Sequence, residues 1–93
     1  MSGDDELGAL RAEVEAIDAR LVELIARRVI VARRIGELKR AEGRMVLDPA
    51  REAEVVRHAG ELARQRGLPA ESVRSIFWSV IALSREAQLP GSP

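Results

Sequence analysis

Residues 5–42, DELGALRAEVEAIDARLVELIARRVIVARRIGELKRAE, decide how the chain folds. The stretch has no Pro, its only glycines are Gly8 and Gly36, and its apolar residues recur at alternating spacings of three and four. This spacing is typical of the a and d positions of helical heptads, which form a stripe along one face of a helix. We call this stripe the heptad seam, and its positions are Leu7, Leu10, Val14, Ile17, Leu21, Leu24, Arg28, Val31, Ile35 and Leu38. The sequence therefore predicts one long helix with a single charged residue, Arg28, in an otherwise apolar face.

The length of this helix predicts how the chain assembles. About 38 helical residues span about 57 Å, whereas a compact chain of 93 residues has a radius of gyration of about 12 Å. Half of the heptad seam would stay in water unless a second copy of the chain covered it, and a two-fold dimer is the commonest such arrangement. We therefore expect an intertwined antiparallel homodimer. The alternative is a helix broken near Gly36, which would give a monomeric four-helix bundle.

Composition limits the classes of function. The chain has 93 residues, enough for a single domain over residues 1–93 with its core at about 5–89. Its 15 basic and 15 acidic residues balance, so nothing indicates a nucleic acid or membrane partner. There is no Cys, which excludes a disulfide framework, a thiolate nucleophile and a Cys-based metal site. The first residues lack an apolar signal core and no apolar run approaches a membrane span, so we expect a cytoplasmic protein.

Two further helices follow the long one, and no strand pattern competes with them. Gly43 is a plausible end for the first helix, and Asp48-Pro49 is a strong start signal for the second, which runs to about Arg66 before Gly67. The third helix opens after Leu68-Pro69 and ends before Pro90. The fold class predicted is all-α, with three helices per chain.

Each apolar stripe turns polar at one point. The first helix offers Arg28 with Lys39 nearby, the second Glu52 with Arg51 beside it, and the third Ser84 and Gln88. Buried polar groups need partners. These side chains could be each other's partners, or they could line a pocket for a polar ligand.

The sequence resembles the all-helical chorismate mutases over nearly its whole length, from about Leu7 to Gln88. The motifs that carry the resemblance are Leu10-Arg11, Ile17-Asp18, Arg27-Arg28, Ile35-Gly36 through Lys39, Asp48-Pro49-Ala50-Arg51-Glu52, and Ser84 with Gln88. The resemblance implies a dimer of three-helix chains that associate along the first helix. It also implies the rearrangement of chorismate to prephenate in aromatic amino-acid biosynthesis, a reaction that needs no metal and no cofactor.

The resemblance assigns roles residue by residue. Arg28 and the partner subunit's Arg11 would hold the two substrate carboxylates, and Lys39 and Gln88 would donate hydrogen bonds to the ether oxygen of the breaking bond. Glu52 would accept from the substrate hydroxyl. The rest of the lining would come from Arg51, Asp48 and Ser84 as polar groups and from Ile35 and Ile81 as apolar walls. Arg85 departs from the family pattern, because an apolar residue is expected there; it would either point outward or alter substrate preference.

Other functions remain open at this stage. An isochorismate pyruvate-lyase or a 4-amino-4-deoxychorismate mutase would use the same scaffold and a similar dicarboxylate, and Glu52 favours chorismate because it is positioned for a hydroxyl. A third alternative is a non-catalytic helical interaction module, in which the polar residues of the seam only set the register. Such a module would need neither Lys39 nor Gln88.

Overall fold

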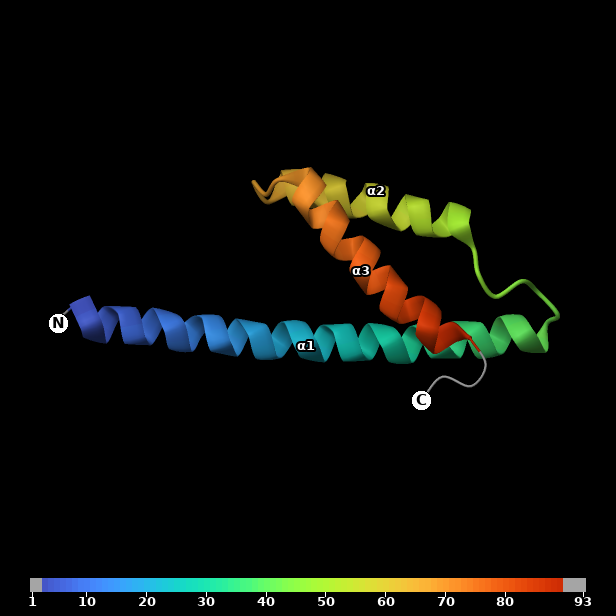
Figure 1. The fold of residues 1–93 in the computed structure, drawn as a ribbon, viewed down its shortest axis with the longest axis horizontal. Helices are drawn as coiled ribbons and strands as arrows, with labels where there is room; N and C mark the ends of the chain where they lie inside the picture. The colour runs from blue at the N-terminus through green and yellow to red at the C-terminus, as the bar shows by residue number, and fades with distance from the viewer. Residues whose placement is uncertain (1–2, 90–93) are drawn as a thin grey trace.

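The computed structural model describes residues 3–89, which form three α-helices: α1 (Gly3–Ala41), α2 (Pro49–Gln65) and α3 (Ala70–Gln88) (Figure 1). The predicted all-α fold is confirmed, and each predicted helix lies within about two residues of its observed bounds. α1 is unbroken through Gly36, so the alternative with a fourth helix is wrong for the described part of the chain.

The helix ends follow from local sequence. Gly43 and Gly67 both have positive φ, of 69° and 72°, a region that glycine enters without steric cost. After α1, the Arg44 amide donates to the Lys39 carbonyl at 2.8 Å and the Gly43 amide donates to the Arg40 carbonyl at 3.1 Å. These two bonds form a Schellman motif, which satisfies carbonyls that the helix leaves unpaired. Asp48 caps α2, since its carboxylate accepts from the Arg51 amide at 3.1 Å, and Pro49 occupies the first helical position.

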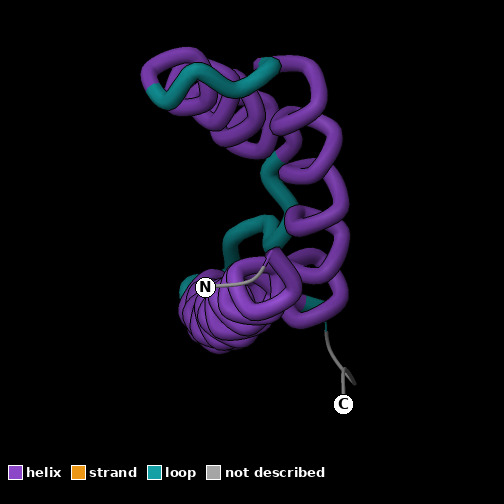
Figure 2. Tube along the Cα trace, turned by 90° about the vertical axis from the view of Figure 1, so that its left-hand side faces the viewer, coloured by secondary structure: helices purple, strands orange, loops and turns teal. Residues whose placement is uncertain are grey.

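α3 is the element that joins the other two helices. It starts beside the end of α2 and crosses diagonally to the C-terminal half of α1, so that it packs on both (Figures 1 and 2). α1 and α2 make no close backbone contact with each other. α1 and α2 therefore lie apart, and α3 connects them along one side (Figure 2).

The contact between α1 and α3 depends on small residues. Ala32 and Gly36 are the buried residues of α1, and they lie next to the seam positions Val31 and Ile35 rather than in the seam itself. A Cβ atom on Gly36 would lie 2.8 Å from the Gln88 carbonyl oxygen and 3.0 Å from the Gln88 Cα. Only a residue without a Cβ allows the end of α3 to come this close. Arg40 also holds the end of α3 against α1, since its guanidinium donates a hydrogen bond to the Gln88 carbonyl.

The core of the described residues is small. α2 buries Val56, Ala59, Gly60 and Ala63, and α3 buries Ile81, Ser84 and Ala87. The apolar residues of the seam, by contrast, are exposed all along α1, from Leu7 (45%) through Ile17 (52%) to Leu38 (46%). The radius of gyration is 17.4 Å, well above the ~12 Å of a compact chain of this length. This extended shape is consistent with a dimer that covers the seam. No helix among residues 3–89 has the length and apolar character that crossing a bilayer requires.

Candidate active site

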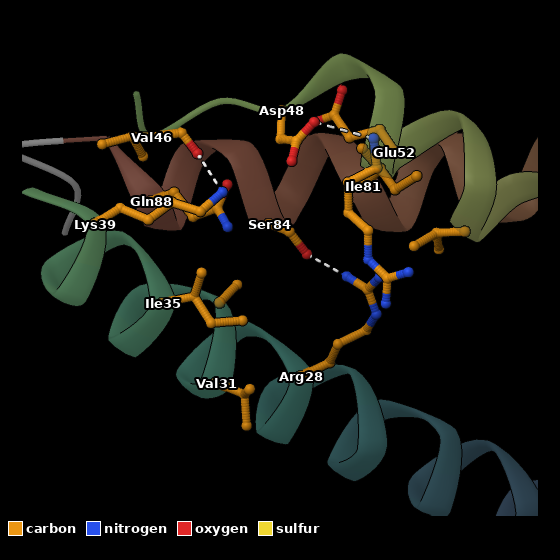
Figure 3. A pocket seen from close by; sticks show the side chains of 13 residues that line it. Arg28, Val31, Ile35, Lys39, Val46, Asp48, Glu52, Ile81, Ser84 and Gln88 are labelled. Atoms are coloured by element: carbon orange, nitrogen blue, oxygen red, sulfur yellow. Dashed lines mark hydrogen bonds between the residues drawn. The ribbon is translucent and has the colours of Figure 1, made fainter. Parts of the chain in front are cut away.

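A cavity of about 260 Å³ opens between the three helices (Figure 3). Its size is slightly below the ~300–1,000 Å³ typical of pockets for drug-sized ligands, which suits a small metabolite. α1, α2, α3 and the α1–α2 connection all contribute to its lining: Arg28, Val31, Ala32, Ile35, Lys39, Val46, Asp48, Arg51, Glu52, Val55, Ile81, Ser84 and Gln88.

All but one of the site residues expected from the sequence line this cavity. The structure brings them together from three helices that are far apart in the chain: Arg28, Ile35, Lys39, Asp48, Arg51, Glu52, Ile81, Ser84 and Gln88. Arg11 is the exception. It precedes Arg28 by 17 residues on the same straight helix, which places it about 26 Å away along the axis. Within a single chain, therefore, Arg11 cannot reach the cavity.

Arg28 projects from α1 towards α3, where its guanidinium donates a hydrogen bond to the Ser84 hydroxyl (Figure 3). Ser84 is buried, and its hydroxyl also donates to the Val80 carbonyl at 3.2 Å. Arg28 is half-buried, yet no carboxylate among residues 3–89 forms an ion pair with it. The arginine in the seam therefore has a neutral hydrogen-bond partner and no ion pair with a carboxylate of the described residues.

Lys39 and Gln88 lie at the opposite end of the cavity from Arg28 (Figure 3). Lys39 Nζ donates to the Val46 carbonyl at 3.2 Å, which ties the ammonium group to the α1–α2 connection. An ammonium has three N–H donors, so this bond leaves donors for a ligand. Gln88 occupies the last position of α3, where Gly36 and Arg40 hold its backbone against α1.

The N-terminus of α2 contributes both charge signs. Asp48 is exposed and uses one carboxylate oxygen to cap the helix. Arg51 lies at the rim, where its guanidinium also pairs with Glu54 at 3.3 Å in an exposed position. With Arg28 and Lys39, Arg51 gives the cavity three cations against the two anions Asp48 and Glu52. The cavity therefore has a net positive lining.

Glu52 and Arg85 form a two-pronged ion pair between α2 and α3. Arg85 Nε donates to one Glu52 oxygen at 2.7 Å, and Arg85 Nη2 donates to the other. The hydrogen bonds from Arg85 are the largest cause of a Glu52 pKa that lies below its usual value. Burial and the Asp48 charge oppose that lowering, whereas the Lys39 charge adds to it. Arg85 does not line the cavity itself, which fits the outward orientation considered from the sequence.

Some lining residues were not expected from the sequence. Val31 belongs to the seam between Arg28 and Ile35, and Val55 belongs to the apolar face of α2, so helical spacing could have indicated both. Ala32 lies beside the seam, where it contacts α3. Val46 comes from the connection between α1 and α2, and periodicity carries no information about the path of such a segment.

The chemistry of this lining favours a small anion with a polar body. Arginine forks suit planar carboxylates, and Lys39 and Gln88 add hydrogen-bond donors between apolar walls. The lining includes no His and no Cys. Within residues 3–89, no group of acidic or imidazole side chains is arranged to hold a metal ion.

Comparison with known families agrees with this chemistry. The family model for chorismate mutase type II matches residues 10–89, which is most of the chain and covers α2, α3 and all but the first residues of α1. A comparison with individual curated proteins gives no match. The chain therefore belongs to the chorismate mutase type II family, and its activity is that of a chorismate mutase, an isomerase that converts chorismate to prephenate.

Proposed function

We propose that chorismate binds in the cavity between α1, α2 and α3, and that the lining residues named from the sequence carry out the rearrangement there. The observation that supports this most directly is Arg28, which is half-buried and has no carboxylate partner among the described residues. Removing a cation from water without a counter-charge is costly. A substrate carboxylate would supply that counter-charge, and a guanidinium can bind it through two parallel hydrogen bonds.

The reaction requires an enzyme that positions the substrate and stabilises the charge that develops in the transition state. In chorismate the ether C–O bond breaks while a C–C bond forms between the enolpyruvyl group and the ring, so no atom enters or leaves. The enzyme has to hold a flexible dianion in its compact conformer, which removes the entropic part of the barrier. It also has to place donors where negative charge develops, at the ether oxygen.

Lys39 and Gln88 supply those donors in our proposal. They come from different helices and face the same end of the cavity (Figure 3). The bond to the Val46 carbonyl holds the Lys39 ammonium group, and the close packing on Gly36 fixes the backbone that carries the Gln88 amide, before substrate arrives. Donors that are already oriented avoid reorganisation during the reaction, which is the basis of this kind of catalysis.

The remaining lining residues orient the substrate. Glu52 accepts a hydrogen bond from the substrate hydroxyl, because an ionised carboxylate is an acceptor only. Ser84 fixes the Arg28 guanidinium, and Asp48 and Arg51 complete the polar rim. Ile35 and Ile81 form apolar walls that restrict the ring.

The second substrate carboxylate requires a residue that the single chain does not bring to the cavity. We propose an antiparallel homodimer in which the partner subunit's Arg11 enters each cavity. If the two copies of α1 cross near residue 23, the partner subunit's Arg11 lies level with about residue 35, between Arg28 and Lys39. The exposed apolar positions from Leu7 to Leu24 support this arrangement, because they need a cover of matching length.

The substrate is tested by identifying products. The purified protein is mixed in turn with chorismate, isochorismate and 4-amino-4-deoxychorismate, and the products are identified by NMR. We expect prephenate from chorismate and much slower turnover of the other two. Pyruvate release from isochorismate as the fastest reaction would make the lyase the true activity, and no turnover of any of the three would favour the non-catalytic module.

The dimer is tested by size-exclusion chromatography with light scattering. We expect a dimer at micromolar concentration and no folded monomer on dilution. Ile17→Asp places a charge in the seam and should dissociate the dimer, whereas Val22→Asp, at a somewhat more exposed apolar position outside the seam, should leave it intact. A stable helical monomer of 10.2 kDa would contradict the shared site.

A further inference from the structure

The ion pair between Arg85 and Glu52 has no part in the scheme above. It is a two-pronged pair, with Nε donating to Oε2 at 2.7 Å and Nη2 donating to Oε1. It also joins two helices, α2 and α3, whereas the pair between Arg57 and Glu61 lies within α2 alone. A fork of this kind fixes the orientation of the carboxylate as well as its charge.

The two partners lie in different environments. The Glu52 side chain is 13% exposed and lines the cavity, while the Arg85 side chain is 45% exposed and lies outside the lining. Arg85 therefore reaches Glu52 from outside the cavity lining. A carboxylate offers about four lone-pair positions, and the fork engages one on each oxygen. The remaining positions are left to accept from a ligand in the cavity.

Charged groups face Glu52 from all three helices. Asp48, at the start of α2, and burial both favour the neutral acid, whereas Lys39 from α1 and Arg85 from α3 favour the carboxylate. Arg85 acts through two hydrogen bonds as well as through its charge, and it is the largest of these influences. Without it, burial and Asp48 would be opposed only by Lys39, and the pKa of Glu52 would rise.

We propose that Arg85 is a positioning residue that acts through Glu52, holding this carboxylate charged and turned towards the substrate hydroxyl. The proposal rests on the role given to Glu52 under the proposed function. Arg85 replaces the apolar residue expected at this point in the family, so this chain fixes Glu52 with a fork from the neighbouring helix. Substrate does not touch Arg85 in this account.

The test is a double-mutant cycle with Arg85→Leu, Glu52→Gln and the combined variant, assayed for kcat/KM on chorismate across the acid pH range. Arg85→Leu should lower kcat/KM by about tenfold to a hundredfold. It should also move the acid side of the pH profile to higher pH, because activity is lost as pH falls through a raised Glu52 pKa. In the Glu52→Gln background, Arg85→Leu should change neither quantity. Arg57→Leu, which removes an exposed pair on α2 away from the cavity, is the matched control and should behave as wild type.

Two outcomes would overturn the proposal. An equal loss of kcat/KM in both backgrounds would mean that Arg85 acts on the substrate directly. A lower melting temperature with an unchanged pH profile and kcat/KM would mean that the pair only holds α2 to α3. If Arg85→Leu does not fold, Arg85→Gln carries the same comparison with a smaller change in polarity.

A ligand-free measurement separates this proposal from the proposed function. Carbon-13 NMR titration of the Glu52 carboxyl in the wild-type protein and in Arg85→Leu should show a higher pKa in the variant. Equal titration midpoints would refute the influence of Arg85 on Glu52 whatever the protein catalyses. Absence of prephenate formation by the wild-type protein would refute the proposed function and leave the titration result standing.

Discussion

The two halves of α1 have the same pattern of seam residues and different surroundings. In the C-terminal half, Ala32 and Gly36 are buried by α3, and the neighbouring Arg28, Val31, Ile35 and Lys39 line the cavity. In the N-terminal half, every residue up to Leu24 is exposed, although Leu10, Val14 and Ile17 are as apolar as any residue of the cavity wall. This half extends beyond α2 and α3 in the fold (Figure 1).

The comparison shows that an apolar stripe in a sequence does not identify the element that covers it. In the C-terminal half, α3 packs on small residues beside the seam, which let it approach closely, while the seam residues Val31, Ile35 and Leu38 stay exposed. The N-terminal half has no such small residues in contact with another element, since Gly8 has no atom within 4 Å of its Cβ position. Its apolar side chains are suited to a helix from a second copy.

Arg28 lies where the two halves meet, and its replacement should have the largest effect. Arg28→Lys should lower kcat/KM by at least about a hundredfold, because an ammonium cannot reproduce a two-pronged grip on a carboxylate. Arg28→Leu should abolish activity and keep or raise the melting temperature, since it completes the apolar seam. Ser84 would keep its bond to the Val80 carbonyl. Unfolding of Arg28→Leu, seen by circular dichroism, would show that the arginine is structural.

Gln88, which packs against the C-terminal half of α1, allows a test based on the pH dependence of activity. In the wild type its amide would donate to the ether oxygen at any pH. A glutamate can donate only when protonated, so Gln88→Glu should be active at low pH and lose activity as pH rises through the pKa of the new carboxyl. The measurement is kcat/KM against pH for both proteins. A flat profile for Gln88→Glu, or full activity at neutral pH, would argue against contact with the ether oxygen.

Two glycines of α1 form a matched pair with a smaller expected effect. Gly36→Ala places a methyl group 2.8 Å from the Gln88 carbonyl oxygen, so the end of α3 must shift. Such overpacking costs about 1–3 kcal/mol, partly offset by the better helix propensity of Ala. It should also lower kcat, because Gln88 moves with its backbone. Gly8→Ala meets no neighbour and should raise stability by up to about 1 kcal/mol without changing kcat.

Thermal melts and initial rates check both variants. Equal effects of the two substitutions would mean that the close contact at Gly36 has no special role in placing α3.

Local signals were enough to predict the helices. Gly43 and Gly67 end α1 and α2 with positive φ, and Asp48-Pro49 starts α2, because each of these choices depends on a few neighbouring residues. The residues expected at the site also line one cavity, apart from Arg11. Their catalytic roles stay a prediction, since they follow from the family pattern.

The contacts between helices could not be predicted from the sequence in the same way. Arg85 directly follows Ser84 in the sequence. Its pairing with Glu52, however, depends on how α3 crosses α2, and helical spacing carries no information about that crossing. The sequence allows a break in α1 at Gly36, whereas α1 continues through this residue and the end of α3 packs closely on it. A glycine in a helix has both interpretations until the neighbouring helix is known.

In our proposal the N-terminal half of one α1, which is exposed in the single chain, completes the cavity formed on the C-terminal half of the other α1. Mixing two variants that we expect to be inactive, Arg11→Ala in the N-terminal half and Lys39→Ala in the C-terminal half, shows whether it does. The two are unfolded together and refolded, and random pairing makes about half of the dimers mixed. In each mixed dimer one cavity is intact and the other has lost both residues. We expect activity to return to roughly a quarter of the wild-type value; mixed dimers that form, as shown by native mass spectrometry, and yet stay inactive would contradict the claim.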